Sequence, residues 1–285
     1  MVVTGSGGLL GTRVAALAAS RGHDVVALRH ADLDVTDEQR VAAAITRHEP
    51  GAVIHCAAYT AVDRAESEAD RAFAVNRDGA RHVAAAAKHV GAIVVYVSTD
   101  YVFDGSSAEP YAPGDRTGPL SVYGRSKLEG ESAVEQVGGE WLIVRTSWLY
   151  GGASGFVPAI LRRASRGEPL RVVDDQRGRP TWAPHAAEAM LELLERGARS
   201  VWHVAAGGDC TWYQLATEAL RLSNHEVPVE RISSAAFGAP ARRPAYSVLD
   251  LEATERLLGR RMPHWREGLA QYVGGDWAEL QRRTA

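Results

Sequence analysis

The chain has 285 residues, 46% of them hydrophobic and 24% charged, and its net charge of −3 gives no reason to expect nucleic acid or an anionic membrane surface as a partner. No apolar run is long enough to span a bilayer and no basic-then-apolar leader precedes the first strand-like residues, so we expect a cytoplasmic protein without a membrane partner. Two distant cysteines, Cys56 and Cys210, and ten histidines without HExxH spacing argue against a disulfide framework and predict no metal site.

The first half of the chain alternates short β-branched runs with stretches of helical periodicity. Strands are expected at MVV, DVVAL, GAVIHCAA and AIVVYVST, with helices between them at GTRVAALAASRG, at DEQRVAAAITRH and from about Asp63 to His89. A further helix is expected to start near Tyr123, and WLIVRTSWLY is the next expected strand. Repeated βαβ units of this kind predict an α/β fold with a Rossmann-type doubly wound parallel sheet.

A glycine-rich turn stands between the first strand and the first helix. TGSGGLLG places Gly5, Gly8 and Gly11 in a GxxGxxG spacing, which suits a tight turn that approaches a pyrophosphate at a helix N-terminus. A glycine-rich turn that binds nothing is the alternative, and the strand–turn–helix context favours the phosphate site. Leu9 and Leu10 complete the predicted cofactor contacts of this turn.

The second strand carries the residue that is expected to discriminate between the two nicotinamide cofactors. NAD sites place an acid at this strand end for the ribose 2′-hydroxyl, whereas NADP sites place an arginine for the 2′-phosphate. The strand ends in Arg29, with no acid before Asp32, so we expect NADPH and keep NADH, with Arg29 as a plain surface arginine, as the alternative. Further cofactor contacts are expected beside the adenine and after the third strand: Asp34, Val35, Ala57, Ala58, Tyr59 and Thr60.

The second half of the chain is more irregular. An amphipathic VPAILRRASRG and the short strand LRVV are followed by the turn-rich DDQRGRPTWAP and the strand SVWHVAA. We expect residues 1–147, with about 170–204 returning to them, to form the NADP-binding Rossmann domain. Residues of about 148–169 and 205–285 are expected to form a smaller C-terminal α/β substrate lobe.

The stretch SVYGRSKLEGE pairs Tyr123 with Lys127 four residues later. Taken alone, this spacing is also that of two neighbours on one helix face. The chain, however, has only two lysines, Lys88 and Lys127, among 32 basic residues, so composition alone would give roughly 0.06 such pairs. Because arginine cannot replace the compact ammonium of lysine, a lysine at this position favours a functional pair.

Thr99 ends the strand AIVVYVST, twenty-four residues before Tyr123. A hydroxyl, a tyrosine and a lysine form the active triad of short-chain dehydrogenases/reductases, and the chain resembles the extended branch of that superfamily. Its motifs are similar, in order and from end to end, to those of the dTDP-4-dehydrorhamnose reductase family. They are VTGSGGLLG, CAAYTAVDRAE, FAVN, STDYVFDG, VYGRSKLEGE, RTSWLYG, VVDDQRGRPT, RRPAYSVLD and MPHWREGL.

The resemblance implies an NADPH-dependent oxidoreductase that reduces the C4 keto group of a dTDP-linked 4-keto-6-deoxy sugar, as in dTDP-rhamnose biosynthesis. Tyr123 would be the catalytic acid, Lys127 would lower its pKa and hold the nicotinamide ribose, and Thr99 would hydrogen-bond the sugar carbonyl or the Tyr123 hydroxyl. A homodimer is left open. The implied substrate contacts are Thr99, Asp100, Tyr101, Trp148, Arg242 and Arg243.

Two residues depart from the family pattern on the substrate side. Arg179 stands where the family has a small residue, and Tyr246 replaces a small or amide residue. A 4-ketoreductase for a different dTDP-deoxysugar of secondary metabolism is therefore the first alternative. The second is a non-catalytic NADP-binding regulatory subunit resembling that of methionine adenosyltransferase, which the presence of all three triad residues disfavours.

Overall fold

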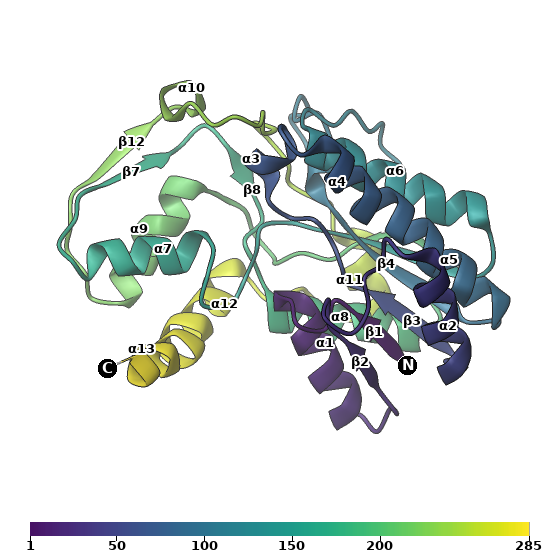
Figure 1. Cartoon of the computed structure of the whole chain (residues 1–285). Coiled ribbons are helices and arrows are strands. Elements are labelled where there is room, and N and C mark those ends of the chain that lie inside the picture. Colours follow the sequence, from purple (N-terminus) through teal and green to yellow (C-terminus); the bar gives the residue numbers. More distant parts are fainter. Residues whose placement is uncertain (285) are drawn as a thin grey trace.

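A six-stranded parallel sheet forms the centre of the larger domain. The computed structural model describes residues 1–284 (Figure 1). The strand order of the sheet is β10-β5-β4-β3-β1-β2. The chain runs outward in both directions from β1, which is the arrangement of a doubly wound Rossmann-type sheet and confirms the predicted fold class. The strands are β1 Val2–Thr4, β2 Val26–Leu28, β3 Ala52–His55, β4 Ile93–Thr99, β5 Trp141–Thr146 and β10 Ser200–His203.

Helices cover both faces of this sheet because its strands are apolar on both sides. Val3, Ile54 and Val95 point into one core, whereas Val2 and Val53, their neighbours along the strands, point into the other. Such continuous apolar strands are typical of a parallel sheet buried on both faces. The first core is covered by α1 Leu9–Ser20, α8 Ala183–Glu195 and α11 Glu252–Leu258, and the second by α2 Glu38–His48, α5 Gly79–His89 and α6 Val122–Val137.

Two short helices and a π-helical turn connect β3 to α5. These are α3 Val62–Ala65, α4 Ala69–Phe73 and η1 Ala74–Asp78. A 3-10 turn, η2 Asp100–Val102, follows β4 directly. Both connections leave the sheet at its carboxyl edge, where open α/β folds bind their ligands.

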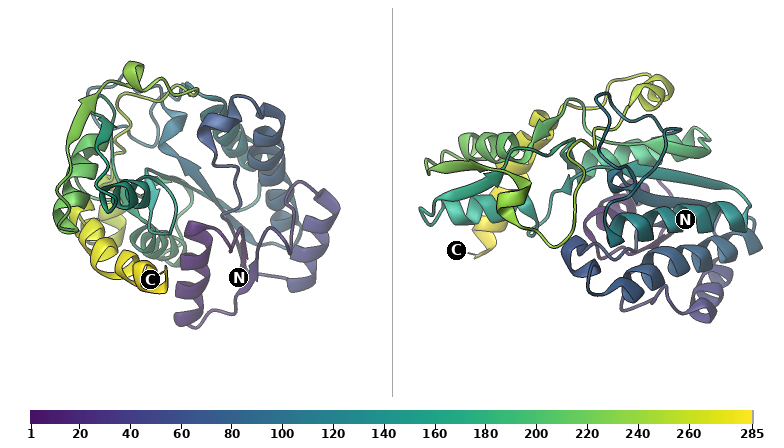
Figure 2. Two further views of the ribbon diagram at one scale, coloured as in Figure 1. Left: turned by 60° about the vertical axis from the view of Figure 1, so that its left-hand side comes forward. Right: turned by 90° about the horizontal axis from the view of Figure 1, so that it is seen from above.

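A smaller lobe of helices and short two-stranded sheets stands beside this edge (Figures 1 and 2). It has its own core, which is rich in aromatic side chains. Its helices are α7 Phe156–Ala164, α9 Trp212–Leu222, α10 Ser234–Phe237, α12 Trp265–Gln271, η3 Tyr272–Trp277 and α13 Ala278–Thr284. Its strands pair as β6 Leu149–Tyr150 with β9 Thr181–Trp182, β7 Leu170–Val173 with β12 Val229–Ile232, and β8 Arg177–Gly178 with β11 Cys210–Thr211.

The expected strand WLIVRTSWLY is interrupted, and this is where the chain enters the lobe. β5 ends at Thr146, and Trp148 adopts a φ of 44°, in the left-handed region that bulky residues rarely occupy. β6 then pairs with β9 instead of continuing in the large sheet. An apolar run without glycine or proline gives no sign of such a break, so the sequence predicted one strand where there are two.

Within the segment 170–204, which is expected to return to the large sheet, the elements pack on different partners. β7 pairs with β12 and packs on α7 and α9 of the lobe, whereas α8 packs on α1 and β10 pairs with β5. α11, in the expected lobe segment, packs on α8. We therefore propose a division in which residues 183–204 and about 250–262 belong to the large domain.

A buried ion pair fixes α6 on the sheet. The Arg145 guanidinium on β5 donates two hydrogen bonds to the Glu131 carboxylate on α6, at 2.9 and 2.7 Å, and both side chains are at most 6% exposed. Ser98 on β4 donates a third hydrogen bond to the same carboxylate. Because the remaining guanidinium nitrogen donates to the carbonyl of Pro113, the buried charges are well hydrogen-bonded.

Substitution of Glu131 by alanine is expected to lower the free energy of unfolding by about 3–5 kcal/mol, because it leaves the Arg145 charge buried without its partner. Urea denaturation would measure this loss. The matched control is Glu140→Ala, which removes an exposed partner of Arg199 and is expected to cost less than about 1 kcal/mol. Equal losses for the two variants would contradict the role given to the buried pair.

Candidate active site

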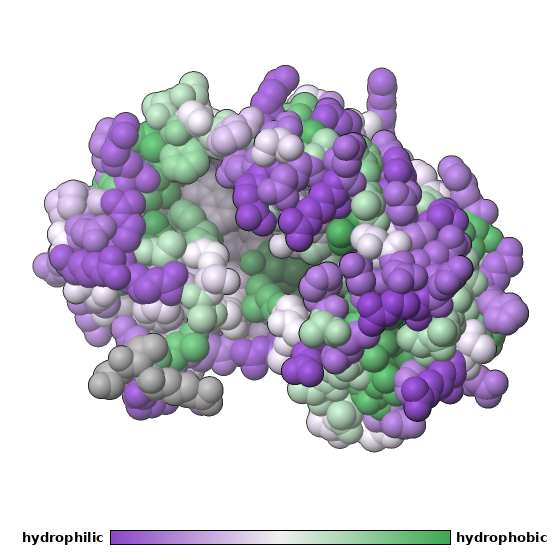
Figure 3. All heavy atoms as spheres, viewed as in Figure 1, coloured by the Kyte–Doolittle hydropathy of each residue, from purple (hydrophilic) through white to green (hydrophobic). Residues whose placement is uncertain are grey.

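A hollow separates the large domain from the lobe (Figure 3). In the large sheet, the carboxyl ends of the neighbouring parallel strands β1, β3 and β4 lie side by side. The glycine turn follows β1, the residues Ala57–Thr60 follow β3, and Thr99 ends β4. α6 brings Tyr123 to the same place, since η2 and α6 are packed together. The fold therefore gathers the sequence-predicted cofactor and catalytic residues at one edge of the sheet.

The glycine turn has the geometry that its sequence predicts. Gly5 has a φ of 67°, and a Cβ placed there would lie 2.4 Å from the backbone nitrogen of Ala57. A Cβ on Gly11 would lie 2.3 Å from the carbonyl oxygen of Gly5, so helix α1 packs directly on the turn. Gly8 caps α1 without a side-chain hydrogen bond, which leaves the helix N-terminus available to an anion.

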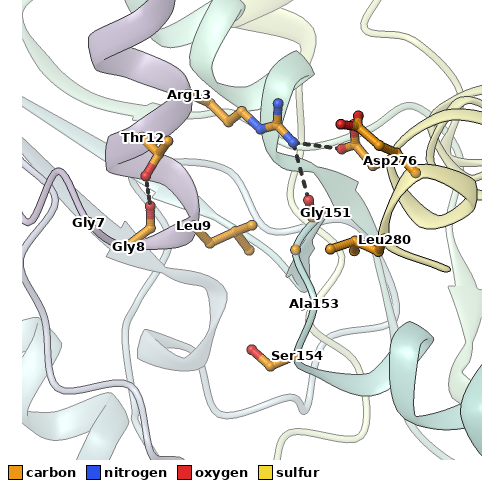
Figure 4. A pocket seen from close by; sticks show the side chains of 12 residues that line it. Gly7, Gly8, Leu9, Thr12, Arg13, Gly151, Ala153, Ser154, Asp276 and Leu280 are labelled. Atoms are coloured by element: carbon orange, nitrogen blue, oxygen red, sulfur yellow. Dashed lines mark hydrogen bonds and ion pairs between the residues drawn. The ribbon is translucent and has the colours of Figure 1, made fainter. Parts of the chain in front are cut away.

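A cavity of about 520 Å³ opens at this helix N-terminus (Figure 4). One wall consists of the turn and the start of α1, including Leu9, whereas Leu10 is buried in the core below. The opposite wall comes from residues 151–154 and from the C-terminal helices. Arg13 joins the two walls, because its guanidinium lies 2.7 Å from a carboxylate oxygen of Asp276 and 3.5 Å from the carbonyl oxygen of Gly151. The sequence reasoning did not identify this second wall.

Arg29 lies exposed beside the turn, at the end of β2. Its aliphatic stem lies 3.3 Å from the position of a Cβ on Gly7, and its Nε donates to Asp32 at 3.1 Å. Asp34 accepts from the backbone and hydroxyl of Thr36, and these hydrogen bonds lower the pKa of its carboxyl. Arg29, the residue predicted to bind the 2′-phosphate, is thus reachable from solvent and has the acidic Asp32 as a neighbour.

Val35 and the residues after β3 are held by buried contacts of the large domain. Val35 is buried against α5. Tyr59 is held by Asn76, whose amide accepts from the Tyr59 N–H at 2.8 Å and donates to the Tyr59 carbonyl at 3.1 Å and to Ser126 on α6 at 2.9 Å. Asn76 is fully buried, and the sequence indicates it only through the motif FAVN. The π-helical turn that carries it has no signature in the sequence, although such turns are frequent near functional sites.

Tyr123 stands in the first turn of α6, and two caps fix that turn. Ser121 accepts from the N–H of Gly124, and Glu66 accepts from the N–H of Val122 at 2.8 Å. The Thr99 hydroxyl faces the Tyr123 phenol. Burial raises the pKa of Tyr123 to about 12, and a hydrogen bond with Thr99 acts in the opposite direction. The expected lowering of the Tyr123 pKa toward neutrality is therefore not found in the protein alone, because the cost of burying a phenolate exceeds the effect of the hydrogen bond.

Lys127 lies one turn further along α6 and is 2% exposed. Its Nζ is 4.0 Å from the centroid of the Tyr96 ring. Burial lowers the pKa of Lys127 to about 7, and the charge of Glu131 opposes this shift. Tyr96 also donates to the carbonyls of Asn76 and Lys127, at 3.0 and 3.3 Å, so the site side of α6 is held firmly against β4.

The expected substrate contacts differ in what their side chains touch. Tyr101 lies edge-on to Tyr123, with 6.1 Å between ring centroids. Trp148 stacks on Trp212, with ring centroids 3.6 Å apart and an angle of 5° between the planes. Asp100 is only 2% exposed, and its carboxylate oxygens face hydroxyl groups of the protein rather than the hollow.

The two arginines expected near the diphosphate also differ. Arg243 makes a bidentate ion pair with Asp63, with nitrogen–oxygen distances of 3.0 and 2.9 Å. Arg243 is half-buried, whereas Arg242 is exposed. Of the departures from the family pattern, Arg179 donates to the carbonyls of Ala206 and Gly208, at 3.1 and 3.0 Å. The Arg179 guanidinium is thus committed to the connection that follows β10.

Within residues 1–284, no group of three His, Cys, Asp or Glu side chains is arranged to hold a metal ion, and no helix is long and apolar enough to cross a bilayer. Cys56 and Cys210 are both free thiols. Burial raises the pKa of each thiol to about 12. Neither cysteine therefore has the thiolate character of a nucleophile.

Comparison with known proteins extends over nearly the whole chain. Residues 1–275 match the family described as RmlD substrate binding domain. The chain is 43% identical over 279 residues to the dTDP-4-dehydrorhamnose reductase of Mycobacterium tuberculosis, covering 95% of this chain and 91% of that protein. It is 38% identical over 278 residues to the dTDP-4-keto-6-deoxy-D-glucose reductase of Streptomyces niveus, covering 95% of each. A crystal structure of dTDP-4-dehydrorhamnose reductase from Bacillus anthracis in complex with NADP superposes with a TM-score of 0.91 at 37% identity, over 95% of this chain and 97% of that one.

Substitution of Gly11 by alanine is expected to weaken NADPH binding roughly 100-fold, since displacing the turn by about 1 Å misplaces its N–H groups. The added Cβ meets backbone that cannot move aside. Isothermal titration calorimetry with NADPH would measure the change. Gly51→Ala is the matched control, because its Cβ would meet nothing within 4 Å. Undiminished affinity in the Gly11 variant would rule out this turn as the dinucleotide site.

Proposed function

The chain belongs to the RmlD substrate-binding-domain family, and from this membership we propose that it reduces the C4 keto group of a dTDP-linked 4-keto-6-deoxy sugar with NADPH. It is an NAD(P)H-dependent oxidoreductase of the dTDP-sugar 4-ketoreductase family. Within that family, we propose dTDP-4-dehydrorhamnose as the substrate. A cytoplasmic location and a homodimer remain parts of this proposal, to be tested by cell fractionation and analytical ultracentrifugation.

One observation carries the proposal. Thr99 and Tyr123 face one another at the carboxyl edge of the sheet, with Lys127 one helical turn away, and the glycine turn opens two strands further along the same edge. A proton donor, a cation and a dinucleotide-binding turn are the groups that hydride transfer to a ketone requires.

Tyr123 is assigned the role of proton donor to the C4 oxygen. A phenol with a pKa of about 12 is poorly suited to act as a base, but it still protonates an alkoxide, whose conjugate alcohol is the weaker acid. The raised pKa therefore suits reduction better than the reverse oxidation. Thr99 is placed to hold the Tyr123 hydroxyl or the substrate carbonyl.

The residues around the cavity fit a dinucleotide. When bound, NADPH would supply the hydride, and the N–H groups at the start of α1 would hold its diphosphate. Lys127 would contact the nicotinamide ribose, and Arg29 the 2′-phosphate. The anionic phosphates would favour the ammonium form of Lys127 and so offset the burial that lowers its pKa to about 7.

A different dTDP-deoxysugar is the second candidate substrate. The similarity to the Streptomyces niveus reductase and the departures at Arg179 and Tyr246 favour it. Spectrophotometric assays of NADPH oxidation with dTDP-4-dehydrorhamnose and with dTDP-4-keto-6-deoxyglucose would distinguish the two candidate substrates. Tight NADPH binding without turnover of either sugar would instead favour the non-catalytic regulatory subunit.

Tyr123→Phe is expected to lower kcat roughly 10²- to 10⁴-fold, because it removes the proton donor and leaves the ring in place. NADPH affinity should stay nearly unchanged, which calorimetry would check beside the spectrophotometric assay. Tyr213→Phe, on α9 of the lobe, is the control for loss of a phenol elsewhere. A fully active Tyr123 variant would exclude Tyr123 as the proton donor.

Arg29→Ala is expected to raise the KM for NADPH roughly tenfold and to leave that for NADH unchanged, because only NADPH carries the 2′-phosphate. Initial rates with both cofactors would give this ratio. Arg47→Ala, which removes an exposed arginine at the end of α2, serves as the control. A uniform effect on both cofactors would indicate that Arg29 does not read the 2′-phosphate.

A further inference from the structure

Asp100 is a buried carboxylate that collects hydroxyl groups from three parts of the chain. Its Oδ1 accepts from Thr99 at 3.1 Å, and its Oδ2 accepts from Ser147 at 3.0 Å and from Ser247 at 2.5 Å. Asp100 is 2% exposed and both serines are 1% exposed, so the cluster lies inside the protein. Three hydroxyl donors at such distances suit an ionised carboxylate, which accepts at both oxygens.

This arrangement fixes the position of the Thr99 hydroxyl. The Thr99 oxygen lies 3.1 Å from Oδ1 of Asp100, and it accepts from the N–H of Tyr101 at 3.2 Å. The Thr99 hydroxyl also neighbours the Tyr123 phenol, whose pKa a hydrogen bond from Thr99 acts to lower. Asp100 therefore holds the hydroxyl that contacts the proposed proton donor.

The two serines belong to segments that connect the large domain with the lobe. Ser147 lies between β5 and the lobe strand β6, next to Trp148, and its oxygen also accepts from the N–H of Arg179 at 3.3 Å. Ser247 donates its own N–H to the carbonyl of Arg177 on β8 at 2.9 Å. Asp100 thus joins the end of β4 to two crossings of the chain into the lobe.

We propose that Asp100 is a positioning residue, whose carboxylate holds the Thr99 hydroxyl beside Tyr123 and ties that hydroxyl to the two segments that carry the lobe. The inference rests on the proposed function, because Thr99 and Tyr123 are the residues that it positions. Asp100 acts through Thr99 and makes no contact with the reacting atoms itself.

The arrangement depends on pH in a defined direction. Burial raises the pKa of Asp100 to about 6, and the three hydroxyls oppose this shift. A carboxylate accepts all three donors only when ionised, so the arrangement is complete above about pH 6 and is lost as the pH falls through that value.

The titratable and charged groups near Asp100 are Tyr101 on η2, Tyr123 on α6, Arg243 beside Tyr101, and Arg179 beside Ser147. Lys127 lies one helical turn beyond Tyr123. The pKa of Tyr123 is raised to about 12 and that of Lys127 is lowered to about 7. The pKa of Lys127 is the one nearest to that of Asp100. A substitution at Asp100 removes only the Asp100 titration and so distinguishes the two in a pH profile.

The first test is Asp100→Asn, which keeps the shape but replaces one acceptor oxygen by a donor. We expect kcat to fall roughly 10- to 100-fold, corresponding to one charge-assisted hydrogen bond, with KM for the sugar and affinity for NADPH little changed. The wild-type kcat/KM should decline below about pH 6, and the variant should lack that decline. Wild-type kcat and an unchanged pH profile in the variant would overturn the proposal.

The second test needs no turnover, so its failure is distinguishable from failure of the proposed function. The carboxyl group of Asp100 would be followed by ¹³C NMR over a pH titration of the full chain, with Asp100→Asn used to assign its signal. Ser247→Ala should shift the titration midpoint upward, because it removes a donor that lowers the pKa of Asp100. Ser165→Ala, an exposed hydroxyl at the end of α7 that donates to the carbonyl of Arg162, should leave it unchanged. An unmoved midpoint in the Ser247 variant would overturn the proposal even if the Asp100 variant failed to fold.

Discussion

The positions of Tyr123 and Lys127 depend on the buried ion pair between Arg145 and Glu131. It joins the last strand before the lobe to the helix that carries Tyr123 and Lys127, and Ser98 ties the same carboxylate to β4. Such a pair adds little net stability over an apolar contact, but its two parallel hydrogen bonds allow only one register between helix and sheet. That register sets Tyr123 opposite Thr99.

A second constraint is the turn at Trp148, which takes the chain out of the large sheet. Because this residue holds a left-handed backbone conformation, β5 stops at the carboxyl edge and its continuation pairs inside the lobe. The indole stacks on Trp212 of α9, so the conformation is supported from the lobe side. The hollow between the two bodies is therefore bounded by a strained but well-packed connection.

Sequence reasoning predicted the parts of the site that depend on local chemistry. The GxxGxxG spacing, the Tyr123–Lys127 pair and the apolar strands of the sheet are all short-range patterns, and the structure brings their residues together. The break at Trp148 and the pairing of β7 with β12 could not be predicted, because periodicity does not say which partner a short strand selects. Two of the three hydroxyl donors of Asp100, Ser147 and Ser247, lie 47 and 147 residues away, at separations for which a single sequence carries no signal.

The contact between Arg13 and Asp276 has a consequence for the biosynthesis of the protein. These residues are 263 positions apart, and they close the cavity in front of the glycine turn. Domains fold as they emerge from the ribosome, N-terminal parts first, so the glycine turn can form early in translation. The wall that faces it is made last, and the complete cavity exists only after nearly the entire chain has been synthesised.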